Sequence, residues 1–484
     1  MKSHDLLSRL AKLEVHSRKL HLDADTFQDL SNQAIDSANK FALETLAGDA
    51  YRPVAPMDVD RFLPTEEGAD WSELISMAEK DVAETGLLCA SEGHLGYIPG
   101  GGLRTSALGD MLAAVYNVYA GLHFASPGAV QMENAMIKWL CGMVGYPEDS
   151  YGNLSSGGSI ANLMAVTVAR DQSGVKAADY HRIVIYLSEQ THHCVHKAIR
   201  IAGLGEAVLR DITLDNRFRM DTEHLASCIR EDLSAGLLPM MVVASAGTTD
   251  TGAIDPLDKI ADLCEVYELW YHIDAAYGGT FMLVDELRSK FAGIERSDSL
   301  AIDPHKGLFL PYGLGALLMK DRKALHDSHF YKANYMQDAL HEMNPSSADF
   351  SPELTKHFRG MRMWMSLSYF GVDVFRRALE EKYLLCRYFY ERIGDLGFEL
   401  GPYPQLSVCI YRYAAGEQTE AINQALIKEL HADGRVFISS TLIHGETWLR
   451  MAILSFRTHQ STIDMALSML ERCIPRAQAR VHIS

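Results

Sequence analysis

Short apolar runs without polar alternation recur between residues 105 and 320, and amphipathic stretches separate them. Buried parallel strands have this composition, and the helices that cover both faces of their sheet lie between them in the chain. The predicted strands are Arg182–Leu187, Met240–Ala244, Trp270–Asp274 and Leu314–Met319. The predicted helices are Ser126–Val144, Ser159–Asp171, His193–Ala202 and Asp255–Glu268. The pattern therefore indicates an α/β fold built on a mostly parallel sheet with helices on both faces.

The pattern differs on either side of this region. Polar helices are predicted before residue 95, interrupted by a Pro- and Asp-rich connector at 48–68. After residue 370, long amphipathic helices flank short strands, as in a small α+β domain. We therefore predict an N-terminal helical segment (1–95), a large domain (96–370) and a small domain (371–484). Residues 322–358 have few regular patterns, and a loop of this length is usually functional.

The charge and the cysteines narrow the choice of partners. The 484 residues carry 45 Lys and Arg against 63 Asp and Glu, a formal charge of −18 that repels phosphate backbones, so no nucleic-acid partner is expected. The eight cysteines contain no Cys-x-x-Cys pair, which argues against a disulfide framework. No signal-peptide core and no apolar run of about 18 residues is seen, so we expect a cytoplasmic protein without a membrane span.

Three motifs lie where strands end, which is where open α/β sheets place their ligands. The first is Ser155-Ser156-Gly157-Gly158-Ser159, which leads into a predicted helix. Its glycines allow a ligand to approach the backbone, and the N–H groups at a helix N-terminus suit a phosphate. A structural turn with a Ser cap explains the same residues equally well, so the motif alone does not decide.

In each of the other two motifs, one ionisable residue suggests a role in the site: Asp274 in the first and Lys306 in the second. Asp274 ends an apolar strand, and a buried carboxylate needs a partner such as a protonated pyridine nitrogen. Lys306 stands between two apolar stretches, so burial is expected to lower its pKa, as a Schiff-base amine requires. A local turn cap and a solvent-exposed lysine are the simpler alternatives for these two residues.

Taken together, the motifs follow one order: the glycine-rich turn, then Asp274-Ala275-Ala276-Tyr277-Gly278, then Asp303-Pro304-His305-Lys306. This order resembles the group II decarboxylases that use pyridoxal 5′-phosphate (PLP), a fold type I family that includes aromatic amino acid, histidine and glutamate decarboxylases. The resemblance runs from about residue 25 to 470, and the His before the Lys is its most specific part. It implies a PLP-dependent decarboxylase of an L-amino acid, with aromatic substrates favoured.

The resemblance also implies roles for individual residues. Lys306 forms the Schiff base, Asp274 pairs with the ring nitrogen, and His192 of Ser188-Glu189-Gln190-Thr191-His192 stacks on the ring; these are the predicted catalytic residues. The other predicted cofactor-binding residues are Gly158, Ser159, Ser245, Ala276, Asp303 and His305. Several family members have Asn in place of Asp303, whose carboxylate has to be protonated or turned away from the phosphate.

Four further residues are predicted to contact the substrate by the same resemblance. Arg450 matches an arginine that binds the α-carboxylate, and Tyr97 and Gly100 match a loop that lines the pocket. Phe350 matches a loop position where aromatic amino acid decarboxylases have a Tyr that returns a proton to the α-carbon. Relatives with Phe there make an aldehyde instead of an amine, which keeps aldehyde synthesis as an alternative.

Decarboxylation to the amine is favoured because the alignment of Phe350 contains gaps and because Tyr331 and Tyr335 offer other acids. An acidic substrate would need a second basic group, for which Arg104 and His94 are candidates. An aminotransferase and an inactive binding protein also remain as alternatives.

A metal-dependent hydrolase is the alternative from a different class, since His192 and His196 are four residues apart, but no Glu follows His192 and we expect no metal. The family resemblance implies a homodimer in which N-terminal helices interlock and the loop at about 322–350 reaches the neighbouring site.

Overall fold

The computed structural model describes residues 3–46, 48–53, 57–331 and 345–483. Its central layer is a seven-stranded sheet in the order β3-β9-β8-β7-β6-β4-β5. The strands are β3 (Tyr151–Ser155), β4 (Ile183–Ser188), β5 (Val208–Ile212), β6 (Leu238–Ser245), β7 (Trp270–Asp274), β8 (Ser299–Ile302) and β9 (Gly315–Met319). Neighbouring strands from β5 to β8 run parallel, whereas β9 is antiparallel to both β8 and β3. The predicted α/β fold with a mostly parallel sheet is therefore confirmed.

The reversed direction of β9 follows from the length of its connection. Only residues 303–314 separate β8 from β9, and their one regular element is the four-residue helix α10 (Pro304–Gly307). A parallel return usually crosses over through a full helix, which this four-residue helix does not provide. The chain instead turns back beside β8. As a result, the segment that carries Lys306 is held to the sheet at both of its ends.

Helices cover both faces of the sheet, and the alternation of side chains along each strand decides which helices they meet. In β4, Val184 and Tyr186 belong to the core under α5, α8 and α9, whereas Ile185 and Leu187 pack under α6 and α7. The helices of the large domain are α4 (Arg104–Tyr116), α5 (Pro127–Val144), α6 (Gly158–Gln172), α7 (His193–Ile201), α8 (Thr222–Ser234), α9 (Leu257–Tyr267), α11 (Arg322–His329) and α12 (Gly360–Phe370). Apolar burial on both faces explains why the strands lack polar alternation.

A second hydrophobic core lies in the C-terminal part. Its four-stranded antiparallel sheet has the order β10-β11-β13-β12. The elements are β10 (Phe398–Leu400), β11 (Val408–Tyr413), β12 (Ser439–Ile443), β13 (Glu446–Ala452), α13 (Val372–Asp395), α14 (Thr419–Asp433) and α15 (Gln460–Ile483). Helix α13 contributes Phe375 and Leu379 to the large core and Phe389 and Ile393 to the second one, so it ties the two together. The predicted boundary at residue 371 remains a prediction.

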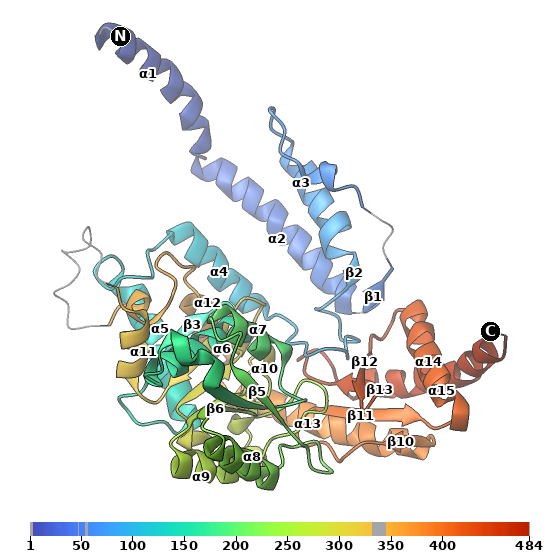
Figure 1. Cartoon of the computed structure of the whole chain (residues 1–484). Coiled ribbons are helices and arrows are strands. Elements are labelled where there is room, and N and C mark those ends of the chain that lie inside the picture. Colours follow the sequence, from blue (N-terminus) through green and yellow to red (C-terminus); the bar gives the residue numbers. More distant parts are fainter. Residues whose placement is uncertain (1–2, 47, 54–56, 332–344, 484) are drawn as a thin grey trace.

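The N-terminal part extends away from this body (Figure 1). It consists of α1 (Ser3–Ser17), α2 (Ala24–Leu46), β1 (Tyr51–Arg52), α3 (Trp71–Met77) and β2 (Gly86–Leu87). Helix α1 exposes Leu6, Leu10 and Leu13 to solvent. No helix in the described ranges is long and apolar enough to cross a membrane.

Candidate active site

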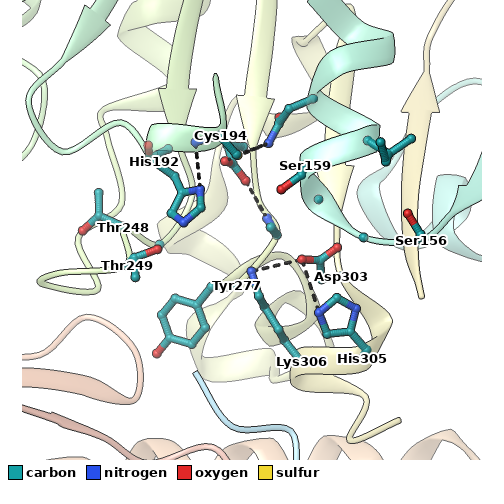
Figure 2. A pocket seen from close by; sticks show the side chains of 18 of the residues that line it. Ser156, Ser159, His192, Cys194, Thr248, Thr249, Tyr277, Asp303, His305 and Lys306 are labelled. Carbon is teal, nitrogen blue, oxygen red and sulfur yellow. Dashed lines mark hydrogen bonds and ion pairs between the residues drawn. The ribbon is translucent and has the colours of Figure 1, made fainter. Parts of the chain in front are cut away.

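A cavity of about 360 Å³ opens where β4, β6, β7 and β8 end, in the range typical of small-molecule sites. All nine residues predicted to bind the cofactor line it: Gly158, Ser159, His192, Ser245, Asp274, Ala276, Asp303, His305 and Lys306. In Figure 2, Ser156 and Ser159 lie on one side of the cavity and His192, Thr248 and Thr249 on the other. Lys306 and Asp303 lie between these two sides (Figure 2). The fold thus brings together residues that are up to 148 positions apart, from Gly158 to Lys306.

The glycine-rich turn is packed too closely for side chains. A Cβ at Gly158 would lie 3.0 Å from Asp303 Oδ2, and a Cβ at Gly315 would lie 2.6 Å from the backbone of Gly157. Helix α6 begins at Gly158, so its first N–H groups have no acceptor within the helix and face this turn. Nδ1 of His305 donates to the Leu314 carbonyl at 2.6 Å, which fixes the ring beside the turn. The arrangement is a backbone cradle suited to a phosphate group.

Lys306 and Asp303 form an ion pair inside the cavity. Nζ of Lys306 lies 3.0 Å from Oδ2 of Asp303, whose side chain is almost fully buried. Burial lowers the pKa of Lys306, but the carboxylates of Asp303 and Asp274 outweigh that effect, so its pKa is raised above the ordinary value. The expectation that the pKa of Lys306 lies below its ordinary value is therefore wrong. Lys306 lines the cavity as predicted, and the nearby carboxylate of Asp303 raises its pKa.

Asp274 is held by one hydrogen bond to each of its oxygens. Oδ1 accepts from the backbone N–H of Ala276, and Oδ2 accepts from the side-chain amide of Asn162, both at 3.1 Å. The side chain lies at the end of β7 and lines the cavity. These donors fix the orientation of the carboxylate and leave lone pairs for a further donor in the cavity.

His192 precedes α7 and caps it. Its Nδ1 accepts from the backbone N–H of Cys194 at 3.3 Å, so in the neutral ring the proton is on Nε2. Burial lowers the pKa of His192, and His193 and Lys306 act in the same direction. Helix α7 starts only after His192, while His193 and His196 are exposed. Within the described residues, no group of three or more His, Cys, Asp or Glu side chains could hold a metal ion.

Arg450 approaches the cavity from the small domain. Its Nε donates to the carbonyl of Thr249, a cavity residue, at 2.7 Å, and Nη1 donates to Ser439 Oγ at 3.0 Å. Nη2 is buried and has no hydrogen-bond partner among the residues that the structure describes. Burial lowers the pKa of Arg450 to about 10. A buried guanidinium with one free nitrogen beside a cavity is suited to an incoming carboxylate.

Arg450 contacts the lining residue Thr249, but none of the four predicted substrate residues itself lines this cavity. Tyr97 is 58% exposed and lies beside Phe437 with ring centroids 5.6 Å apart. Gly100 packs directly against the backbone behind the cavity, because a Cβ there would lie 2.2 Å from the His305 carbonyl oxygen. Gly100 therefore supports the segment that carries Lys306 rather than lining the pocket.

The assignment of Phe350 to a substrate-contacting loop is wrong. Phe350 is 2% exposed and packs against Tyr151, with ring centroids 4.4 Å apart, and under the Arg322 guanidinium. The side chain is a core residue that anchors its segment to β3. Tyr331 is exposed, and Tyr335 lies outside the described residues.

Several cavity residues were not predicted. They include Asn162, Gln190, Cys194, Thr248, Thr249, Tyr277 and Tyr312. A signal existed for Asn162, since it follows Gly158 by four residues and so lies on the same face of α6. Thr248 and Thr249 belong to the segment after Ser245, where β6 ends. Tyr312 follows the lysine by six residues, and nothing in its local pattern distinguishes it.

Comparisons with known proteins agree with this geometry. A model of the pyridoxal-dependent decarboxylase conserved domain matches residues 59–413. An aromatic-L-amino-acid decarboxylase of Bacillus atrophaeus is 31% identical over 473 residues, covering 94% of this chain and 96% of the relative. The crystal structure of Oryza sativa TDC with PLP and tryptamine superposes with a TM-score of 0.89 at 25% identity, covering 94% of this chain and 99% of that one.

A solved structure of Rhodiola rosea 4-hydroxyphenylacetaldehyde synthase also superposes, with a TM-score of 0.86 at 22% identity. It covers 94% of this chain and 99% of the other. At that identity the likeness concerns the fold alone.

The residues present fit PLP. The first N–H groups of α6 at the glycine cradle have no acceptor within the helix, Asp274 keeps lone pairs for a further donor, and the Lys306 amine lines the same cavity. The fold and the site thus define a PLP-dependent enzyme of fold type I. The chain belongs to the pyridoxal-dependent decarboxylase family. It is a carboxy-lyase that acts on an amino acid.

Proposed function

We propose that the chain decarboxylates an aromatic L-amino acid to the corresponding amine, as a homodimer in the cytoplasm. The free Nη2 of Arg450 carries this proposal, because it provides a buried site for the α-carboxylate next to the cavity. PLP, when bound, supplies an electron sink for the electron pair released as carbon dioxide leaves. The residues of the chain hold the cofactor and orient the substrate.

Each of these residues has a distinct task in the proposal. Lys306 holds the cofactor covalently, Asp274 keeps the ring nitrogen protonated, and His192 packs on the ring face. The glycine cradle with Ser159 and His305 binds the phosphate. Arg450 would hold the α-carboxylate of the substrate and so fix the orientation of the bond that breaks.

The charges around the cavity favour an aromatic over an acidic substrate. Arg104 is exposed and hydrogen-bonded to Asn39. Burial lowers the pKa of His94 to about 4, so this ring is neutral at pH 7. Neither candidate supplies a second cation in the cavity. Tyr97 packs beside Phe437 and is close enough to Arg450 to affect its pKa. The relatives named above include an aromatic-L-amino-acid decarboxylase.

Amine rather than aldehyde is the proposed product. The argument for aldehyde synthesis rested on Phe350 in place of a proton-donating Tyr, and the burial of Phe350 removes that argument. The chain retains Tyr331 near the start of the loop segment, with its ring exposed. We propose that a tyrosine of this segment, Tyr331 or Tyr335, returns the proton to the α-carbon.

The exposed N-terminal arm supports the homodimer. Leu6, Leu10 and Leu13 recur at intervals of four and three residues on α1, and all three are solvent-exposed in the single chain. An amphipathic helix of this length is marginal in water unless its apolar face is covered. A second copy of the chain would cover it, and sedimentation of the wild type against Leu10→Glu tests this.

All eight cysteines are free, which supports a reducing compartment.

A panel of the twenty amino acids tests the function. Purified enzyme with PLP should release carbon dioxide and amine from tryptophan, tyrosine or phenylalanine, without peroxide. Release of aldehyde, ammonia and peroxide instead would show aldehyde synthesis. Turnover of glutamate in place of the aromatic substrates would show an acidic specificity.

A further inference from the structure

A row of buried polar side chains runs along β7 toward Asp274. Trp270, His272 and Asp274 alternate with apolar residues and so share the face of the strand that α6 covers. Trp270 Nε1 donates to Ser299 Oγ at 2.9 Å, and Ser299 Oγ lies 2.8 Å from His272 Nδ1. His272 Nε2 lies 2.7 Å from Asn162 Oδ1, while the Asn162 amide donates to Asp274. These polar groups are buried among apolar neighbours, and buried polar groups need an explanation.

The chemistry of the groups fixes the direction of this chain. The nitrogen of the Asn162 amide faces a carboxylate, so its oxygen faces His272 and accepts from Nε2–H. Burial lowers the pKa of His272 to about 4, and a neutral ring with its proton on Nε2 must accept at Nδ1. Ser299 is then the donor to Nδ1, and its oxygen accepts from Trp270, which can only donate. Every hydrogen bond therefore points toward Asp274.

We propose that Asn162 and His272 are positioning residues of this active site, which fix the Asp274 carboxylate, in its ionised form, toward the ring nitrogen of the cofactor. The inference rests on the role proposed above for Asp274. His272 acts only through Asn162, because its ring reaches Asn162 and Ser299 but is fully buried away from the cavity lining. Its task is to hold the amide in the orientation that presents N–H, rather than oxygen, to Asp274.

Helix α6 gives the arrangement a second consequence. Gly158 at the start of α6 belongs to the phosphate cradle, and Asn162 lies one turn further along, about 6 Å at 1.5 Å per residue. One rigid element thus touches both ends of the cofactor site. The distance between the phosphate cradle and Asp274 is set by the helix and not by a loop.

Two matched variants of His272 test the proposal. His272→Gln keeps a donor for Asn162 and an acceptor for Ser299, whereas His272→Leu has a similar volume and neither group. The measurement is the dissociation constant of apoprotein for PLP and for 1-deaza-pyridoxal phosphate, in which carbon replaces the ring nitrogen. We expect His272→Leu to weaken PLP binding by about 10-fold or more and His272→Gln by less than about 3-fold. The deaza analogue should bind all three proteins with the same affinity, within about 2-fold.

The other outcomes decide against the proposal. Equal loss for PLP and the deaza analogue in His272→Leu would mean that His272 serves packing alone, and unchanged PLP binding would also overturn the inference. Asn162→Asp, isosteric but unable to donate to Asp274, should weaken PLP selectively and carries the test if His272→Leu does not fold.

Asp274→Asn separates this inference from the function on which it rests. If Asp274→Asn loses PLP selectively and both His272→Leu and Asn162→Asp do not, only the positioning role fails. If Asp274→Asn shows no selectivity, the assigned role of Asp274 fails and the positioning role fails with it.

Discussion

Lys306 and Asp303 lie three residues apart on one short helical turn, with Nζ of the lysine 3.0 Å from Oδ2 of the carboxylate. An amine must be unprotonated to attack the cofactor aldehyde. The carboxylate works against this, because it raises the pKa of Lys306 against the effect of burial. Cofactor capture by this protein should therefore depend on pH through Asp303.

Asp303→Asn should move cofactor capture to lower pH. Loss of the carboxylate lowers the pKa of Lys306, so the free amine persists on acidification, and the pH midpoint for capture should fall by roughly one unit. The rate at which PLP added to apoprotein gives the visible absorbance band is measured from pH 6 to pH 9. Glu295→Gln, an exposed change, should leave the profile of the wild type. An unchanged profile in Asp303→Asn would contradict the pairing.

Lys356→Met should strongly destabilise the fold. Lys356 Nζ lies 2.8 Å from Glu133 Oε2 and both side chains are buried, so the variant leaves a buried carboxylate without its cation. The free energy of unfolding should fall by about 3–5 kcal/mol. Lys138→Met is the matched control, because its partner Glu148 is exposed and such pairs contribute about 0–1 kcal/mol. Urea unfolding of both variants checks this, and equal losses would refute the difference.

His94→Phe should stabilise the protein, and most clearly in acid. His94 is 1% exposed, and within the described ranges its ring nitrogens have no partner beyond the backbone of Cys89, so replacing it should gain about 1–3 kcal/mol at pH 7. Burial lowers its pKa to about 4, below about 6.5 in the unfolded chain. As pH falls from 6.5 toward 4, protons bind the unfolded state first and stability is lost.

The variant should escape that part of the acid loss. Unfolding midpoints at pH 7.5 and pH 5 measure it, with exposed His196→Phe as control. A variant less stable than wild type at pH 7.5 would show that His94 has a polar partner in the assembled protein.

Arg450→Lys should impair substrate binding despite keeping the positive charge. A lysine cannot reproduce the fork that bonds Thr249 and Ser439 while offering a third nitrogen to a carboxylate. We expect kcat/KM to fall by about 100-fold, mostly through KM. Arg412→Lys, on neighbouring β11 and paired with Glu399 and Glu446, is the control and should change kcat/KM little. A normal KM in Arg450→Lys would exclude Arg450 from carboxylate binding.

The sequence predicted four strands of the main sheet and the cofactor residues because both leave local signals, whereas β3, β5 and β8 were not predicted. Apolar runs mark β4, β6 and β7, and ligand residues follow the ends of these strands, as in Ser245 and Asp274. The direction of β9 was missed, because it depends on the connection before it containing only a four-residue helix.

Contacts between distant segments could not be predicted. The pKa of Lys306 depends on which way the Asp303 side chain turns, and the hydrogen bond from Asn162 to Asp274 joins residues 112 positions apart. The prediction for Phe350 was wrong because it matched a loop of uncertain length to the family on the identity of a single residue. Its burial against Tyr151 is a matter of tertiary packing, which no local pattern records.

The close approach of Gly100 to the His305 carbonyl limits how this enzyme can be re-engineered. Any side chain introduced at this position would force its Cβ against a backbone oxygen 2.2 Å away. The backbone segment that carries Lys306 would have to move, and the point of cofactor attachment would move with it. A side chain cannot therefore be introduced at position 100 alone; a donor loop would have to be grafted together with the segment it rests on.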